Sequence, residues 1–310
     1  MGGNAIKSSS RLNATNFQAT LDSFYVKFLP LLGISKEEVA SLGSGGKKSV
    51  GETHGDIDIG VSLTKVMQKN GLKTKEDLEK FVEEQAKKIS NEVVVMKGLN
   101  VTSLAYPIEG DDQKGKFVQV DLMPTDDLEW TKWSYFSPTS KESKYKGAHR
   151  NLLLASISKY KELKVLETGK NKDGEEVPVT WTRLLYDMNG GLFLATQSIK
   201  GKKGLLSTPK TISRDFITKN PKEIAEKLFW KGIDHNELGS FEQVYSKVMD
   251  KRFGNREKRN EILALAKRGY ENNNFDVPPE MNKINESSTI NRINVYLGEN
   301  CGKKEWKKDR

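Results

Sequence analysis

Residues 56–59, Asp-Ile-Asp-Ile, alternate two carboxylates with two isoleucines. Successive side chains of a β-strand point to opposite faces of the sheet. Asp56 and Asp58 therefore share one face, while Ile57 and Ile59 point toward a core. Two carboxylates on one face are a place to hold a divalent metal ion, so the segment predicts a strand that carries a candidate metal site.

A second strand of the same kind is predicted over residues 117–124, FVQVDLMP. Along this segment two sets of residues alternate. One set is Val118, Val120 and Leu122, and the other is Gln119, Asp121 and Met123. The alternation places Asp121 on the polar face. If this strand lies beside the first, three carboxylates converge.

The turn before the first strand is rich in glycine and lysine, LGSGGKK over residues 42–48. Its glycines allow the backbone to approach a phosphate closely, and its serine and lysines add a hydroxyl donor and two cations. The turn is therefore a candidate phosphate-binding site.

Taken in chain order, these three motifs resemble the palm of the DNA polymerase beta-like nucleotidyltransferases, most closely the family X branch. The motifs are Gly43-Ser44, the Gly-Asp-Ile-Asp of residues 55–58 and the Val-Asp-Leu-Met-Pro of residues 120–124. A following segment is similar to the family X segment that packs under the sugar of the incoming nucleotide, and it contains Tyr135, Phe136, Ser137, Lys146, His149 and Arg150. The resemblance covers residues 42–154, about a third of the chain. Thirteen positions separate Gly43 from Asp56, somewhat more than is common in the family, so Gly45-Gly46 could take the part of Gly43-Ser44 as the phosphate-binding turn.

The resemblance implies an α+β fold in which a mixed sheet flanked by helices forms a polymerase beta-like palm. It also implies two bound Mg²⁺ ions, with Mn²⁺ as a possible substitute. Asp56 and Asp58 would bind both ions, and Asp121 would bind chiefly the ion that activates an attacking 3′-hydroxyl. These three aspartates are the expected catalytic residues.

The resemblance further implies a binding site for a nucleoside triphosphate. The residues expected to contact it are Gly43, Ser44, Lys47, Lys48, Tyr135, Phe136, Lys146 and Arg150. The Gly-Ser pair would hold the β- and γ-phosphates, and one of the two turn lysines would add charge. The cations near residue 150 could face the triphosphate, or they could be the ordinary start of a helix. The aromatic residues between 130 and 136 could stack a base or belong to the core.

The reaction implied is nucleotide transfer from an NTP or dNTP to a nucleic-acid 3′-hydroxyl, by a template-directed polymerase or a terminal transferase. Two alternatives stay open: transfer to a protein or small molecule, and a catalytically silent palm that binds DNA or RNA. Asp56 and Asp58 could also be exposed turn carboxylates, because Gly-Asp is common in turns. The ordered combination of a glycine turn, Asp-x-Asp and a third strand aspartate favours the enzyme.

Composition agrees with a partner made of phosphates. The 310 residues include 51 basic and 42 acidic ones, for a net charge of +9. A lysine-rich solvated surface would explain the same excess. The single cysteine and the lack of an apolar run near eighteen residues lead us to expect a cytoplasmic protein with no membrane partner. The sequence does not constrain the oligomeric state.

We expect two domains, a palm with N-terminal helices over residues 1–160 and a basic lobe over residues 161–310 that passes from α/β to mainly helical. Periodicity and capping signals predict helices over residues 16–32, 35–41, 73–91, 152–157, 220–230, 240–252 and 255–270. Strands are predicted over residues 92–99, 101–106 and 191–196, and a helical pattern just before the last of these, from residue 181. Residues 1–12 are expected to form a loose arm, and residues 168–178 an exposed hairpin or a boundary between lobes.

Two basic segments of the C-terminal half could contact a nucleic-acid backbone. One is the run at residues 200–203, with Lys200, Lys202 and Lys203. The other is the basic side of the helix predicted over residues 255–270, with Arg256 and Arg259. A solvated surface is the alternative explanation for both.

Overall fold

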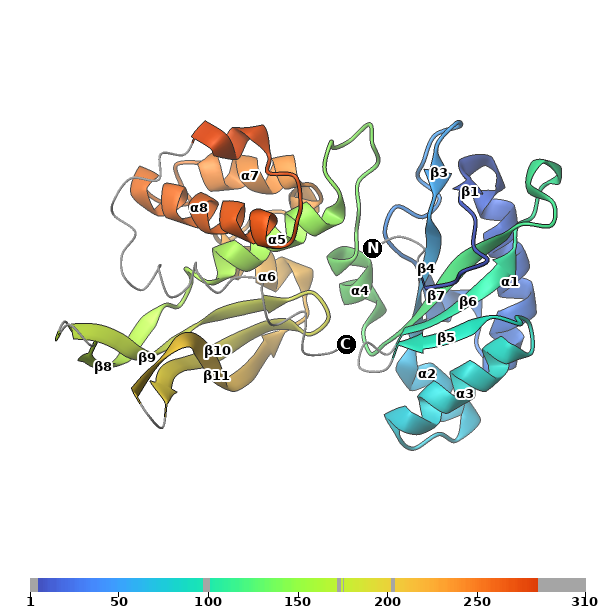
Figure 1. The fold of residues 1–310 in the computed structure, drawn as a ribbon, viewed down its shortest axis with the longest axis horizontal. Helices are drawn as coiled ribbons and strands as arrows, with labels where there is room; N and C mark the ends of the chain where they lie inside the picture. The colour runs from blue at the N-terminus through green and yellow to red at the C-terminus, as the bar shows by residue number, and fades with distance from the viewer. Residues whose placement is uncertain (1–4, 97–100, 172–173, 175, 202–203, 284–310) are drawn as a thin grey trace. The chain divides into compact units, whose positions relative to one another are not determined.

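The computed structural model describes residues 5–96, 101–171, 174, 176–201 and 204–283 (Figure 1). The chain divides into two compact units, Met1–Glu142 and Ser143–Arg310. This division lies before the boundary expected at residue 160, because helix α5 (Gly147–Ser158) packs on elements of the second unit. Helices and mixed sheets together make the α+β class predicted from the sequence.

The first unit is built on a five-stranded sheet with the order β2-β4-β7-β6-β5. Strands β4 and β7 are parallel, and the other neighbours are antiparallel, so the sheet is mixed as expected. The strands are β2 (Val39–Ser41), β4 (Asp56–Ser62), β5 (Val93–Met96), β6 (Val101–Pro107) and β7 (Phe117–Thr125). Residues 97–100, between β5 and β6, lie outside the described residues.

One face of this sheet forms the core of the first unit. Ile57 and Ile59 of β4 are 1% and 0% exposed and belong to one cluster with side chains of α1 and α3. The alternation predicted for β4 and β7 is thereby confirmed, and it leaves the acidic residues on the opposite face. The helices of this unit are α1 (Phe17–Leu32), α2 (Leu63–Asn70), α3 (Lys75–Lys87) and α4 (Leu128–Ser134).

The helix predicted over residues 35–41 is reduced to one 3-10 turn, Lys36–Glu38. The capping box that signalled it is present at Ser35 and Glu38. The next residues instead form β2, because Val39 and Ala40 are buried and pair with β4. A pairing partner about twenty residues away therefore overrides the local helix signal.

The prediction of a loose arm over residues 1–12 is wrong for the described part of that segment. Ile6 and Leu12 are 2% and 0% exposed. Leu12–Asn13 (β1) pairs with Thr53–His54 (β3) in a two-stranded sheet. Isolated apolar residues at positions 6 and 12 carry no periodicity, so their burial leaves little signal in the sequence.

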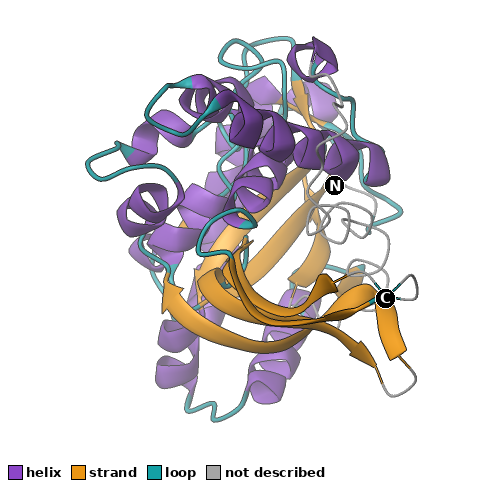
Figure 2. Cartoon of the chain, turned by 90° about the vertical axis from the view of Figure 1, so that its left-hand side faces the viewer, coloured by secondary structure: helices purple, strands orange, loops and turns teal. Residues whose placement is uncertain are grey.

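The second unit contains a four-stranded antiparallel sheet with the order β11-β10-β9-β8. Figure 2 shows its long, curved strands, β8 (Lys164–Lys170), β9 (Glu176–Asp187), β10 (Gly191–Gly201) and β11 (Gly204–Thr218). The hairpin predicted over residues 168–178 is confirmed by the pairing of β8 with β9. The helical pattern predicted from residue 181 is wrong, since residues 181–187 belong to β9 and pair with β10.

Helix α5 packs on β9, and helices α6 (Pro221–Leu228), α7 (Phe241–Met249) and α8 (Arg256–Asn272) pack against α5. At its tightest point, Gly269 of α8 faces Leu152 of α5, where a Cβ on the glycine would lie 2.6 Å from a leucine methyl carbon. The three helices predicted over residues 220–270 are confirmed. The lobe is nevertheless a sheet covered by helices, and so less helical than expected.

Candidate metal centre

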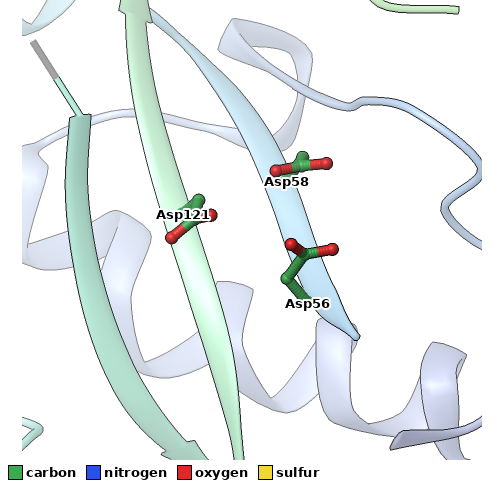
Figure 3. Close-up of side chains that lie close together, drawn as sticks. All are labelled: Asp56, Asp58 and Asp121. Atoms are coloured by element: carbon green, nitrogen blue, oxygen red, sulfur yellow. The ribbon is translucent and has the colours of Figure 1, made fainter. Parts of the chain in front are cut away.

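The register of β4 and β7 brings the three predicted aspartates together. The parallel ladder places Asp58 opposite Asp121 and Asp56 opposite Gln119. Figure 3 shows the carboxylates of Asp56 and Asp58 on β4 beside that of Asp121 on β7. Each offers an oxygen atom, and these atoms all lie within 4.8 Å of one another. Three carboxylates are thus close enough to bind a metal ion together.

The carboxylates of this centre repel one another in partly buried surroundings. Burial, together with the charges of Asp56 and Asp121, raises the pKa of Asp58 to about 7. Burial also raises the pKa of Asp121, although hydrogen bonds from Ser103 and Gln119 oppose that shift. In the metal-free site, a proton on one of the carboxylates relieves this repulsion. A bound divalent cation would relieve it instead.

Two neighbours hold the Asp121 carboxylate. The Ser103 hydroxyl of β6 donates to its Oδ1 at 2.6 Å. The Gln119 amide nitrogen donates to Oδ1 at 2.9 Å and to Oδ2 at 3.0 Å. Sequence reasoning assigned neither residue a role. A role for Gln119 beside Asp121 could have been predicted, because residues two apart on a strand share a face. The contact of Ser103 with Asp121 depends on the pairing of β6 with β7 and could not.

The glycine turn approaches the centre through Gly43. The β2–β4 pairing continues one residue further, where the Leu42 N–H donates to the Asp58 carbonyl at 2.9 Å. Gly43 follows with φ 63°, and a Cβ at this position would lie 3.3 Å from Oδ2 of Asp58. A Cβ on Gly45 would instead meet Ser41. Of the two alternatives for the phosphate-binding turn, Gly43-Ser44 is therefore the one that borders the carboxylates.

The lysines of the turn differ in their surroundings. The Lys47 ammonium lies 3.7 Å from the centre of the Phe136 ring, and burial lowers its pKa. The Lys48 ammonium donates to the Thr53 carbonyl at 2.7 Å. Phe136 directly follows Tyr135, which caps the C-terminus of α4. The chain after α4 is thereby brought next to the glycine turn.

Lys146 and Arg150 belong to the second unit. Lys146 is exposed and precedes α5. The expectation that Arg150 faces a triphosphate does not hold, because its side chain is 0% exposed. Its Nε donates to the Leu238 carbonyl, and its Nη1 donates to Asn151 Oδ1 at 3.1 Å. The cationic pattern around the start of α5 thus includes a residue that is buried in the second unit.

The residues expected to contact nucleic acid are also in the second unit. Lys200 lies near the end of β10 and forms an ion pair with Glu167, while Lys202 and Lys203 lie outside the described residues. Arg256 is exposed in the first turn of α8. The Arg259 guanidinium donates to the carbonyl of Met249, the last residue of α7, at 2.7 Å and so caps that helix.

No protein-family model matches the chain, and no curated protein is significantly similar to it. Within the described ranges, no helix has the length and apolar character that crossing a membrane requires. The acidic cluster and the turn beside it are therefore the features from which a function can be inferred.

Proposed function

We propose that this protein is a metal-dependent nucleotidyltransferase whose first unit is a polymerase beta-like palm. It would transfer a nucleotide from an NTP or dNTP to a nucleic-acid 3′-hydroxyl and release pyrophosphate. One observation carries the proposal: Asp58 and Asp121 lie opposite each other in a parallel ladder, with Asp56 beside them and the Gly43 turn against Asp58. Gly43 and the three aspartates, which lie apart in the sequence, are thus neighbours in the first unit.

The donor set fits a hard divalent cation. All three groups within the 4.8 Å cluster are carboxylates, which are ligands that Mg²⁺ and Mn²⁺ prefer over softer metals. Asp56 and Asp58 would contribute from adjacent same-face positions of β4, and Asp121 from β7. When bound, such ions neutralise the triphosphate and lower the pKa of the attacking hydroxyl.

The remaining residues support binding of a triphosphate. Gly43 has no side chain between the turn and Asp58, so an anionic ligand can approach the carboxylates along the turn. The Lys47 cation on the Phe136 ring adds positive charge beside the same turn. We assign the phosphates to Gly43 and Ser44 and the sugar to Tyr135 and Phe136.

The charge distribution supports a nucleic-acid acceptor. Residues 1–142 contain 18 basic and 20 acidic side chains, whereas residues 143–310 contain 33 and 22. The whole net positive charge of the protein thus belongs to the second unit. A strongly basic unit suits the backbone of DNA or RNA better than a neutral small molecule.

Primer extension tests the proposal. Labelled DNA and RNA 3′ ends, single-stranded and primer–template, are incubated with each NTP or dNTP and Mg²⁺ or Mn²⁺. The wild type should extend them, and Asp56→Asn/Asp58→Asn should not. Asp22→Asn, which removes an exposed carboxylate paired with Lys36 in the same unit, should extend them as the wild type does.

Two results would contradict the proposal in different ways. If the folded wild type binds Mn²⁺ but extends no 3′ end, the acceptor is not nucleic acid, and proteins and small molecules become the acceptors to test. If wild type and double mutant bind nucleic acid equally and neither is active, the protein is a silent binding module.

A further inference from the structure

Gln119 joins the metal centre to the N-terminal segment. Its side chain is 3% exposed and lies on the acidic face of the sheet, opposite Asp56. The amide oxygen accepts the N–H groups of Ala5 at 2.9 Å and Ile6 at 3.0 Å. The amide nitrogen donates to both oxygens of Asp121. Only this orientation of the amide satisfies both sides, because a carboxylate cannot donate and an N–H cannot accept.

The segment 5–10 is anchored independently of Gln119. Ile6 is 2% exposed. The Ser10 N–H donates to the Phe117 carbonyl at 2.7 Å, next to a parallel bridge between Ser9 and Phe117. The Lys7 N–H donates to Glu92 at 2.7 Å. The two N–H groups that face Gln119 are therefore held in place by contacts of the same segment with β7 itself and with Glu92, the residue before β5.

The two donors to Asp121 differ in what they fix. The Ser103 hydroxyl contacts one oxygen only, which leaves the carboxylate free to rotate about that contact. The Gln119 nitrogen contacts both oxygens and so also fixes the plane of the group. Without it, repulsion from the neighbouring carboxylates of Asp56 and Asp58 would turn the group away.

We propose that Gln119 is a positioning residue of the metal centre and that docking of residues 5–10 sets its position. The affinity for the metal ion then depends on a segment that does not itself contribute a ligand. This inference rests on the proposed function only in requiring that the three aspartates bind a divalent ion. Partners of a ligand commonly contribute in this way in metal sites.

Mn²⁺ binding to the full chain, followed by electron paramagnetic resonance of the free ion, tests the inference. Gln119→Leu should weaken binding about ten- to a hundredfold. Ile6→Asn places an amide in an apolar site, so it should undock the segment and weaken binding in the same direction. Ala5→Pro removes one N–H donor without changing a buried apolar side chain, and it should also weaken binding. Asp22→Asn, which removes a carboxylate paired with Lys36 away from this segment, should leave the affinity unchanged.

A double-mutant cycle separates positioning from general loss of structure. If the segment acts through Gln119, Ile6→Asn should cause no further loss of affinity in the Gln119→Leu background. Additive losses would overturn the inference. So would unchanged affinity in Gln119→Leu or in folded Ala5→Pro. Absence of Mn²⁺ binding in the wild type would instead contradict the proposed function, and the two failures are thereby distinguishable.

Discussion

At the scale of single residues, Asp58 carries an unfavourable charge in the metal-free site. Its pKa is about 7 in the folded chain against an ordinary value of 3.8. The folded state therefore binds this proton more tightly than the unfolded state. The corresponding stability is complete below about pH 4 and is lost as the pH rises through 7. Metal-free protein should consequently become less stable toward alkaline pH on account of this group.

Asp58→Asn should stabilise the metal-free protein at pH 8, because it removes the charge while keeping the shape. We expect an increase of roughly 1–3 kcal/mol in the free energy of unfolding at pH 8, shrinking toward zero near pH 4. Urea unfolding in EDTA across this range measures it. A gain of equal size at both ends of the range would contradict the assigned cause. Added Mn²⁺ should reverse the order of stability, since only the wild type retains the full site.

A matched glycine, Gly51, separates the effect of a side chain at Gly43 on the metal site from the effect of backbone strain alone. Gly43→Ala and Gly51→Ala both place a side chain at positive φ, 63° and 90°, and each should lower the free energy of unfolding by about 1 kcal/mol. A Cβ at Gly51 meets nothing within 4 Å, whereas one at Gly43 meets Asp58. Only Gly43→Ala should therefore weaken Mn²⁺ binding. Equal metal affinity in the two variants would show that the turn does not border the site.

At the scale of elements, local patterns in the sequence predicted those strands and helices whose signals are short-range. Alternation identified β4 and β7, and capping residues identified α3. Strand β2 was missed because its partner, β4, is reached only through tertiary pairing. The same limit applies to the site. The three aspartates could be proposed from alternation, but Ser103 and the N-terminal segment reach Asp121 through contacts that no local pattern encodes.

The cap of α3 offers a test of whether lost stability alone affects the metal site. Thr74 accepts the Asp77 N–H at 3.0 Å, and Asp77 accepts the Thr74 N–H in return. Thr74→Ala should lower the free energy of unfolding by about 1 kcal/mol. Its Mn²⁺ affinity should equal that of the wild type, because α3 packs on the opposite face of the sheet from the carboxylates. A weakened affinity would mean that the site variants report stability instead of geometry.

At the scale of the whole molecule, chemistry and charge are divided between the units. The acidic centre lies in the first unit, whereas residues 143–310 carry all of the net positive charge. Binding of a nucleic acid should accordingly depend on the second unit and weaken with salt. Substitutions should then impair metal binding and the proposed nucleic-acid binding separately.

Arg256→Ala tests this division. Arg256 is exposed at the start of α8, and loss of one phosphate contact should lower the slope of log affinity against log salt by about 1. Lys114→Ala removes an exposed cation of the first unit and should leave that slope unchanged. Fluorescence anisotropy with labelled oligonucleotides at several salt concentrations measures both. Mn²⁺ affinity should be the same in both variants.

The parallel pairing of β4 with β7 also bears on the order of events during folding. Parallel neighbours require a long crossover, and here the chain between them contains α2, α3, β5 and β6. Because closing such a loop is slow and entropically costly, we expect the closure to be part of the folding barrier and the close approach of the Asp58 and Asp121 carboxylates to be completed only after it. A bound ion should then slow unfolding while leaving the refolding rate nearly unchanged. The metal ion would thus stabilise the native state after folding and would not assist the folding step itself.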